Sequence, residues 1–142
     1  MYRHILIPTD GSELAQHGVA QGLALAKSLG AKVSVIFVVE PFTEMTGRFL
    51  EAVARYAELR QEQATSVLDR AANAAQEAGV SCKTIQVENG QPHQAIIAAA
   101  EDRGCDLIVM SSHGRSGLSA LLIGSVTNKV LAHTKTPVLV CQ

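Results

Sequence analysis

Aromatic residues are scarce in this chain. It has no Trp, two Tyr and three Phe among 142 residues, whereas hydrophobic residues make up 47% of the sequence. The core must therefore be aliphatic, built from Ala, Val, Ile and Leu, and such a core suits helices packed on a parallel sheet. A chain of this length fits one domain, so we expect a single domain over residues 1–142.

The chain also lacks an excess of either charge. Lys and Arg number 12 against 13 Asp and Glu, and this balance argues against a nucleic-acid binder, which would carry a basic face. The apolar runs are too short to span a membrane, and the N-terminal residues lack the features of a signal peptide. We therefore expect a cytoplasmic protein without a membrane partner. Its three cysteines, Cys82, Cys105 and Cys141, are odd in number and suit reduced thiols.

Two familiar phosphate-binding patterns are missing. A Walker A loop ends in Gly-Lys-Ser/Thr, and no Gly-Lys pair occurs in the sequence. The dinucleotide pattern Gly-x-Gly-x-x-Gly would follow the first predicted strand, but the turn there contains Gly11 alone. A nucleotide site in this chain must therefore use another loop.

Short apolar runs alternate with longer helical stretches along the chain. The runs at 5–8, 32–39, 82–87, 106–110 and 136–141 are predicted strands, and 82–87 has the alternation of a strand near a sheet edge. Helices are predicted over 12–29, 48–78 and 92–103, with another before the last strand. We interpret the charges of the long helix, Glu51, Arg55, Glu58, Arg60 and Glu62, as a solvated face. The order predicts an α/β, Rossmann-like fold with a parallel sheet and helices on both faces.

The segment after the fourth strand has the composition of a ligand-binding loop. It contains three glycines and several hydroxyl side chains between Ser111 and Thr127. Gly124 either lies inside a helix over 118–133, at a cost of about 1 kcal/mol relative to Ala, or precedes a helix that begins near Ser125. We favour the second alternative. Ser125 would then be the N-cap, and the N–H groups of residues 126–128 would form an anion site.

The turn after the first strand is the second candidate region. If the first and fourth strands are neighbours, both loops meet at the carboxyl edge of the sheet, where doubly wound folds bind ligands. Asp10 would then accept hydrogen bonds from a ribose or base, or it is a turn residue that caps the first helix. Arg115 either neutralises phosphate or is a solvated loop residue.

Catalytic and metal sites are not indicated. Ser112 and His113 are adjacent, and adjacent side chains rarely face each other, so the pair does not predict a nucleophile and its base. No Gly-x-Ser-x-Gly elbow is present. The other histidines are dispersed along the chain and lack the spacing of a zinc site.

At this point the sequence resembles the universal stress protein family. The opening, residues 4–12, looks like the family's first strand and turn, and residues 136–140 look like its last strand. The ATP-binding branch of the family carries Gly-x2-Gly-x9-Gly-Ser/Thr, which falls here on Ser111, Gly114, Gly124 and Ser125. The spacing matches in full. Ser111 stands where the pattern has its first Gly, and a Ser disfavours positive φ.

The resemblance implies a sheet of order 3-2-1-4-5 and a site for ATP with Mg or Mn. Pro8, Thr9 and Asp10 would line the adenosine end, and Val38 would contact the adenine. The remaining site residues implied for ribose and phosphates are Met110, Ser111, His113, Gly114, Arg115, Ser116, Gly117, Gly124, Ser125, Val126 and Thr127. Members often dimerise through their last strands, here the apolar run 138–141.

The leading hypothesis is an ATP-binding regulatory protein of the stress response, whose state an unidentified protein partner reads. Two alternatives stay open. One is a slow ATPase or autophosphorylating enzyme, although the sequence shows no general base beside a nucleophile. The other is a nucleotide-free dimeric scaffold, which the Ser111 departure would allow.

Overall fold

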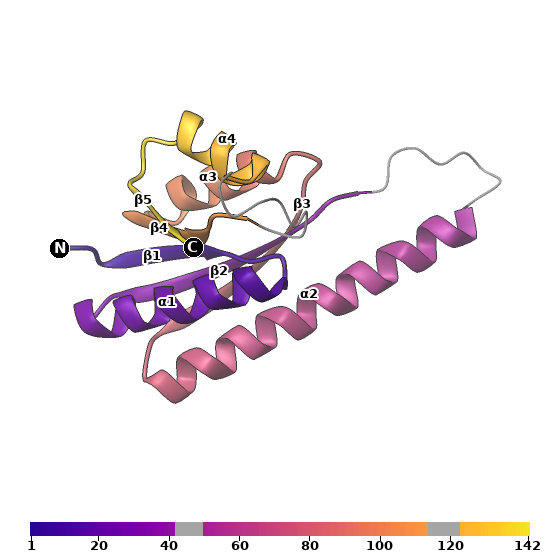
Figure 1. The fold of residues 1–142 in the computed structure, drawn as a ribbon. Coiled ribbons are helices and arrows are strands. Elements are labelled where there is room, and N and C mark those ends of the chain that lie inside the picture. The colour runs from indigo at the N-terminus through magenta and orange to yellow at the C-terminus, as the bar shows by residue number, and fades with distance from the viewer. Residues whose placement is uncertain (42–49, 114–122) are drawn as a thin grey trace.

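A computed structural model describes residues 1–41, 50–113 and 123–142 of the chain. Its centre is a five-stranded parallel sheet in the order β3-β2-β1-β4-β5 (Figure 1). The strands are β1 His4–Pro8, β2 Lys32–Val39, β3 Cys82–Glu88, β4 Leu107–Ser111 and β5 Val138–Cys141. The expected fold class and strand order are confirmed. Because β1 and β4 pair at the centre, with Ile5 opposite Leu107, the loops after them meet at one edge.

Helices cover both faces of the sheet. Helices α1 (Glu13–Leu29) and α2 (Leu50–Ala78) lie on one face, and α3 (Pro92–Asp102) and α4 (Ser125–His133) lie on the other (Figure 1). The N-terminal part of α2 extends beyond the sheet, and its first ten residues are almost all exposed. The expected start of this helix at residue 48 lies outside the described residues.

The core is aliphatic and has two parts, one on each face of the sheet. Alternation along β1 sends Ile5 and Ile7 towards α1 and α2, whereas Leu6 packs with Ile108 and Val130 towards α3 and α4. Contact between α1 and β1 is so close that a Cβ on Gly22 would lie 2.4 Å from a methyl carbon of Ile7. Glycine at this helix position therefore permits the close approach.

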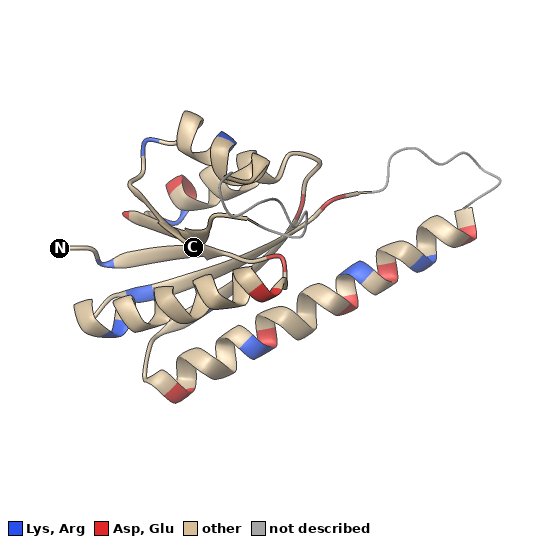
Figure 2. Cartoon of the chain, in the orientation of Figure 1, with Lys and Arg blue, Asp and Glu red and all other residues tan. Residues whose placement is uncertain are grey.

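Charged residues lie mainly on the helices and at the strand ends. Figure 2 marks acidic and basic residues alternating along α2, while most of the sheet carries neither. Helix α1 begins with the Ser12 hydroxyl accepting from Ala15 N–H (3.2 Å) and ends at Gly30, whose φ of 67° is left-handed. Among the helices that the structure describes, none has the length and apolarity needed to cross a bilayer.

Candidate functional site

A pocket of about 320 Å³ opens at the carboxyl edge of the sheet, where β1 and β4 end and α4 begins. Every described residue of the predicted site lines it: Pro8, Thr9, Asp10, Val38, Met110, Ser111, His113, Gly124, Ser125, Val126 and Thr127. The other four predicted residues, Gly114, Arg115, Ser116 and Gly117, lie outside the described residues. The fold therefore brings together residues from three separate segments of the sequence.

The turn after β1 is fixed by its own side chains. The Asp10 carboxylate accepts a hydrogen bond from Ser12 N–H through Oδ1 (2.9 Å), and the Thr9 hydroxyl accepts from Gly11 N–H (3.2 Å). Gly11 has a φ of 80°, which an L side chain rarely adopts. Asp10 is thus a turn residue, but Ser12, and not Asp10, caps α1.

The end of β4 is tied to the first turn of α4. The Thr127 hydroxyl donates to the Ser111 carbonyl (2.9 Å), and Gly124 N–H donates to the Ser112 carbonyl (2.7 Å). Ser111 is a strand residue, and no described residue other than glycine has a positive φ. The replacement of the family's first Gly by Ser111 therefore introduces no backbone strain.

Helix α4 presents its N-terminus to the pocket. The helix begins at Ser125 with Gly124 as N-cap, so the prediction that Gly124 precedes the helix is confirmed. The predicted cap at Ser125 is wrong by one residue. The Asn128 N–H donates to the Gly124 carbonyl (2.9 Å), so the N–H groups without intrahelical partners belong to residues 125–127, not 126–128. The first turn holds no Asp or Glu to offset the helix dipole.

The His113 ring lies in the pocket wall and is only 6% exposed. Its Nδ1 shares a hydrogen bond with the Ser112 hydroxyl (2.9 Å), so the expectation that these neighbours would not face each other is wrong. Ser112 is itself buried and does not line the pocket, which leaves it poorly placed to attack a ligand. His113 Nε2 is buried and has no hydrogen-bond partner among the described residues.

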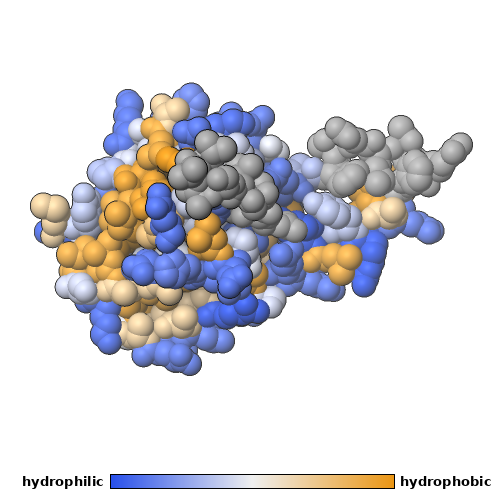
Figure 3. All heavy atoms as spheres, viewed as in Figure 1, coloured by the Kyte–Doolittle hydropathy of each residue, from blue (hydrophilic) through white to orange (hydrophobic). Residues whose placement is uncertain are grey.

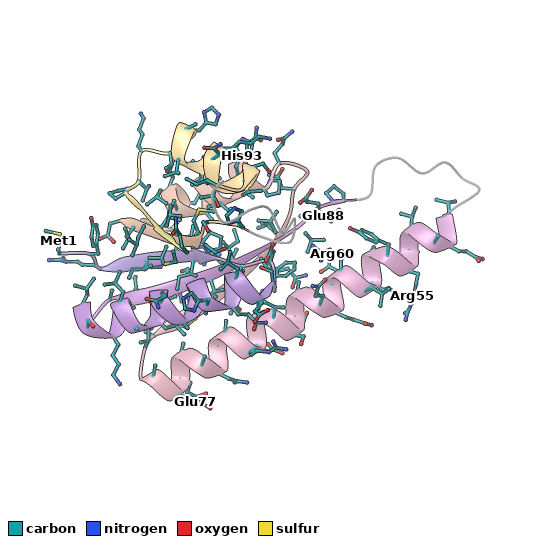
Figure 4. All side chains as sticks on the ribbon, viewed as in Figure 1. Met1, Arg55, Arg60, Glu77, Glu88 and His93 are labelled. Carbon is teal, nitrogen blue, oxygen red and sulfur yellow. The ribbon has the colours of Figure 1, made fainter. Side chains whose placement is uncertain are left out.

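Arg60 is a pocket residue that the sequence interpretation missed. It was assigned to a solvated face, but its side chain is 8% exposed and lines the pocket. Figure 4 shows it rising from the side of α2 that faces the sheet. The signal was available, because Arg60 lies four residues before the buried Ala64, and Ala64 four before the buried Leu68.

Several other lining residues come from elements without a recognisable motif. They are Ala15 of α1, Ile36 of β2, Glu40 after β2, and Pro92 and Ile96 of α3. Of these five residues, only Pro92 could be placed from the sequence, because a proline favours the first turn of a helix and so marks the start of α3. The other four reach the pocket through tertiary packing.

The described residues contain no group of three or more His, Cys, Asp or Glu side chains that could hold a metal ion. His93 and His133 lie near each other, with ring centroids 5.8 Å apart. Partial desolvation, with the nearby charges of Lys129 and His133, lowers the pKa of His93. Within the described segments, the carboxylates that line the pocket are those of Asp10 and Glu40.

Comparison with known proteins places this architecture in a family. The chain matches the model of the universal stress protein family over residues 1–142. The chain belongs to the universal stress protein family. One relative, universal stress protein MJ0531 of Methanocaldococcus jannaschii, is 34% identical over 144 residues, which cover all of this chain and 83% of that protein.

Solved structures share the fold. UspA, a universal stress protein from Lactobacillus plantarum, superposes with a TM-score of 0.84 and 25% identity, covering 99% of this chain and 98% of that one. A universal stress protein in complex with cAMP has a TM-score of 0.74 and 24% identity, covering 99% and 97%. The family resemblance drawn from the motif residues is thus confirmed.

Proposed function

We propose that this universal stress protein binds ATP in the pocket at the carboxyl edge of its sheet and acts as a regulatory protein of the stress response. The observation that carries the proposal is the first turn of α4. Its three N–H groups have no partner among the described residues and no acidic side chain in their own turn, and residues 125–127 line the same pocket as His113. Such a helix N-terminus attracts phosphate.

The phosphates would lie against α4. Gly124 presents no side chain at the cap, and the hydrogen bonds from Gly124 and Thr127 to the β4 end hold the first turn in place. His113 is held by Ser112 on one side, so a phosphate oxygen would satisfy its free ring nitrogen. The site is therefore organised before the ligand arrives, which lowers the entropic cost of binding.

The nucleoside would lie towards β2. Ile36, Val38, Pro92 and Ile96 supply an apolar wall for the flat faces of a base, and Asp10 lies at the β1 end to accept from ribose hydroxyls. A family member of the same fold was solved in complex with cAMP, which is an adenine nucleotide. That ligand supports the placement of an adenine nucleotide in this fold.

A divalent cation would be held mainly by the phosphates. Mg²⁺ commonly binds through phosphate oxygens, waters and one or two carboxylates, not through a complete protein cage. The described residues offer no metal-binding cluster, so phosphate oxygens and waters would supply most of the ligands. We propose Mg or Mn as the accompanying ion.

Regulation is favoured over catalysis because, among the described residues that line the pocket, no general base is paired with a nucleophile. Ser112 is bonded to His113 but does not line the pocket. The alternatives remain a slow ATPase or autophosphorylating enzyme and a nucleotide-free scaffold. An unidentified protein partner would read the nucleotide state.

Titration calorimetry with Mg-ATP on the wild type and on Gly124→Val tests the proposal. We expect micromolar binding by the wild type and its loss in the variant, since a Val side chain would occupy the space beside the helix cap. Circular dichroism melts of both proteins check that the variant folds. No binding by a folded wild-type protein would sink the ATP proposal and favour the scaffold.

We further propose that two chains pair through β5. This strand is an edge of the sheet, and Leu139 on it is 45% exposed. Figure 3 shows apolar surface in the region of β5 and α4, and an apolar edge strand invites pairing with a second copy. Sedimentation analysis of the wild type and of Leu139→Lys tests this. We expect the wild type to be a dimer and Leu139→Lys to be a monomer. A monomeric wild type would contradict the pairing.

A further inference from the structure

Arg60 is held in place by contacts that leave one of its donors unused. The guanidinium carbon lies 5.3 Å from the centre of the Phe37 ring, and one terminal nitrogen donates to the side-chain oxygen of Gln63. Its Nε is buried and has no partner among the described residues. A buried donor without a partner costs stability, and arginine almost never remains buried and unpaired for packing alone.

The charge of Arg60 is not neutralised within the described part of the chain. Asp10 and Glu40 line the same pocket, but neither forms an ion pair with Arg60. The ion pair on the described part of α2 joins Arg55 and Glu58, whose side chains are exposed and do not line the pocket. Neither pocket carboxylate comes within 4.0 Å of the Arg60 guanidinium. The pocket is therefore lined by a fixed cation that no described carboxylate neutralises, which is a feature suited to an acceptor atom on a ligand.

The position of Arg60 separates it from the phosphate end. It packs on Phe37 of β2, whereas the first turn of α4 is bonded to the end of β4. In the sheet, β1 lies between those two strands, so the two ends of the pocket are about 10 Å apart at the usual strand spacing. A ligand with phosphates against α4 would present its nucleoside, not its phosphates, to Arg60.

We propose that Arg60 is a nucleoside-binding residue supplied by α2, donating a hydrogen bond from its guanidinium group to an acceptor on the base or ribose. This rests on the proposed function, and it gives the long helix a direct part in recognition. Because the donor is pre-positioned by Phe37 and Gln63, little side-chain entropy is lost on binding.

The test is Arg60→Met, which keeps the side chain long and able to pack on Phe37 but removes the donors. Calorimetry would measure affinity for ATP, adenosine and inorganic tripolyphosphate. We expect ATP and adenosine to bind at least about tenfold more weakly, as for loss of a hydrogen bond from a charged group, with tripolyphosphate unchanged. The melting temperature of the empty variant should equal or exceed that of the wild type, because an unpaired buried charge is gone.

Arg55→Met is the matched control, since Arg55 lies on the same helix but is exposed, on the side away from the sheet (Figure 4). It should change none of these affinities. Adenosine binding by Arg60→Met at wild-type strength would overturn the inference, as would equal weakening of tripolyphosphate and ATP.

Parallel titration of Gly124→Val separates the two proposals. Suppose that Gly124→Val loses ATP binding but Arg60→Met binds adenosine as the wild type does. The proposed ATP site is then supported, and the proposed role of Arg60 is contradicted. If the wild type binds neither ATP nor adenosine, both fall together.

Discussion

The two edges of the same sheet differ in how completely their polar groups are paired. At the amino edge, Asp106 accepts from the N–H groups of Arg3 and His4 at 2.9–3.1 Å, and the His4 ring bonds the Ser34 hydroxyl at 2.8 Å. At the carboxyl edge, Arg60 and His113 each retain a buried nitrogen without a partner among the described residues. Paired groups serve the fold, whereas unpaired ones are available to a ligand.

The two edges also differ in how their charges are compensated. At the amino edge, desolvation opposes ionisation of Asp106, but the N–H groups of Arg3 and His4 outweigh it, and the pKa of Asp106 is lowered. At the carboxyl edge, the positive end of α4 has no acidic side chain in its first turn. The first edge is thus internally compensated, whereas at the second edge the first turn of α4 carries no acidic side chain that would offset the helix dipole.

Ser125→Asp should separate binding from stability most strongly. A carboxylate in the first turn of α4 offsets the helix dipole and should raise the free energy of unfolding by about 0.5 kcal/mol. The same charge would repel phosphate at close range and should weaken ATP binding about a hundredfold. Calorimetry and urea unfolding measure the two effects.

Ser125→Ala is the control for that substitution. It removes the hydroxyl without adding charge, so ATP affinity should fall by less than about tenfold, the effect of one neutral hydrogen bond. If Ser125→Asp binds ATP as tightly as Ser125→Ala does, phosphate does not lie at this helix end.

Asp106→Ala should have the reverse pattern, lowering stability but not binding. It leaves the N–H groups of Arg3 and His4 without their acceptor, at an expected cost of about 1–2 kcal/mol in the free energy of unfolding. The pocket at the other edge should keep its ATP affinity. Asp102→Ala, at an exposed position near the end of α3, should change neither quantity. A large loss of ATP affinity in Asp106→Ala would contradict the conclusion that the amino edge serves stability and the carboxyl edge serves binding.

The smallest expected effect is a pH dependence at the amino edge. Burial, with a smaller contribution from the charge of Lys32, lowers the pKa of His4 below its ordinary 6.5. The folded state then binds fewer protons than the unfolded state, so stability is complete above pH 6.5 and falls as the pH drops below it. Urea unfolding from pH 7.5 to 5 measures the slope.

His4→Gln should reduce the slope attributable to this ring, and His17→Gln, at an exposed position, should not. A slope that is the same in all three proteins would show that His4 is not its source. The pKa of Asp106 is lowered as well, so the stability that this carboxylate contributes is lost at a more acidic pH than the contribution of His4. The pH range of each loss therefore distinguishes the two residues.

Much of the fold follows from local patterns. The strands and the start of α4 beside Gly124 were predictable because β-branched runs and helix-breaking glycines act locally. The parallel arrangement followed from the alternation of strands and helices, and the strand order from the family resemblance. The N-cap was misplaced by one residue because Ser125 is a favourable cap by type, whereas the bond from Gly124 to the Ser112 carbonyl decides the start. That bond joins two segments and leaves no local signature.

The candidate site was less predictable. Arg60 was missed because its charge suggested solvent, although its spacing from Ala64 placed it on the buried stripe. Ile36 and Ile96 look like ordinary core residues in the sequence and line the pocket only because of how α3 packs on β2. The segment 114–117, predicted to hold ribose and phosphates, lies outside the described residues and stays a prediction.

The most direct test of the account is an NMR titration of ¹⁵N-labelled protein with Mg-ATP. We predict large shifts for the backbone amides of residues 125–127 and for the Nε–H of Arg60, with the amides of Arg3, His4 and Asp106 unchanged. Those shifts would place the ligand at the edge whose buried donors are unpaired. Shifts confined to the amino edge, or none at millimolar ATP, would contradict it.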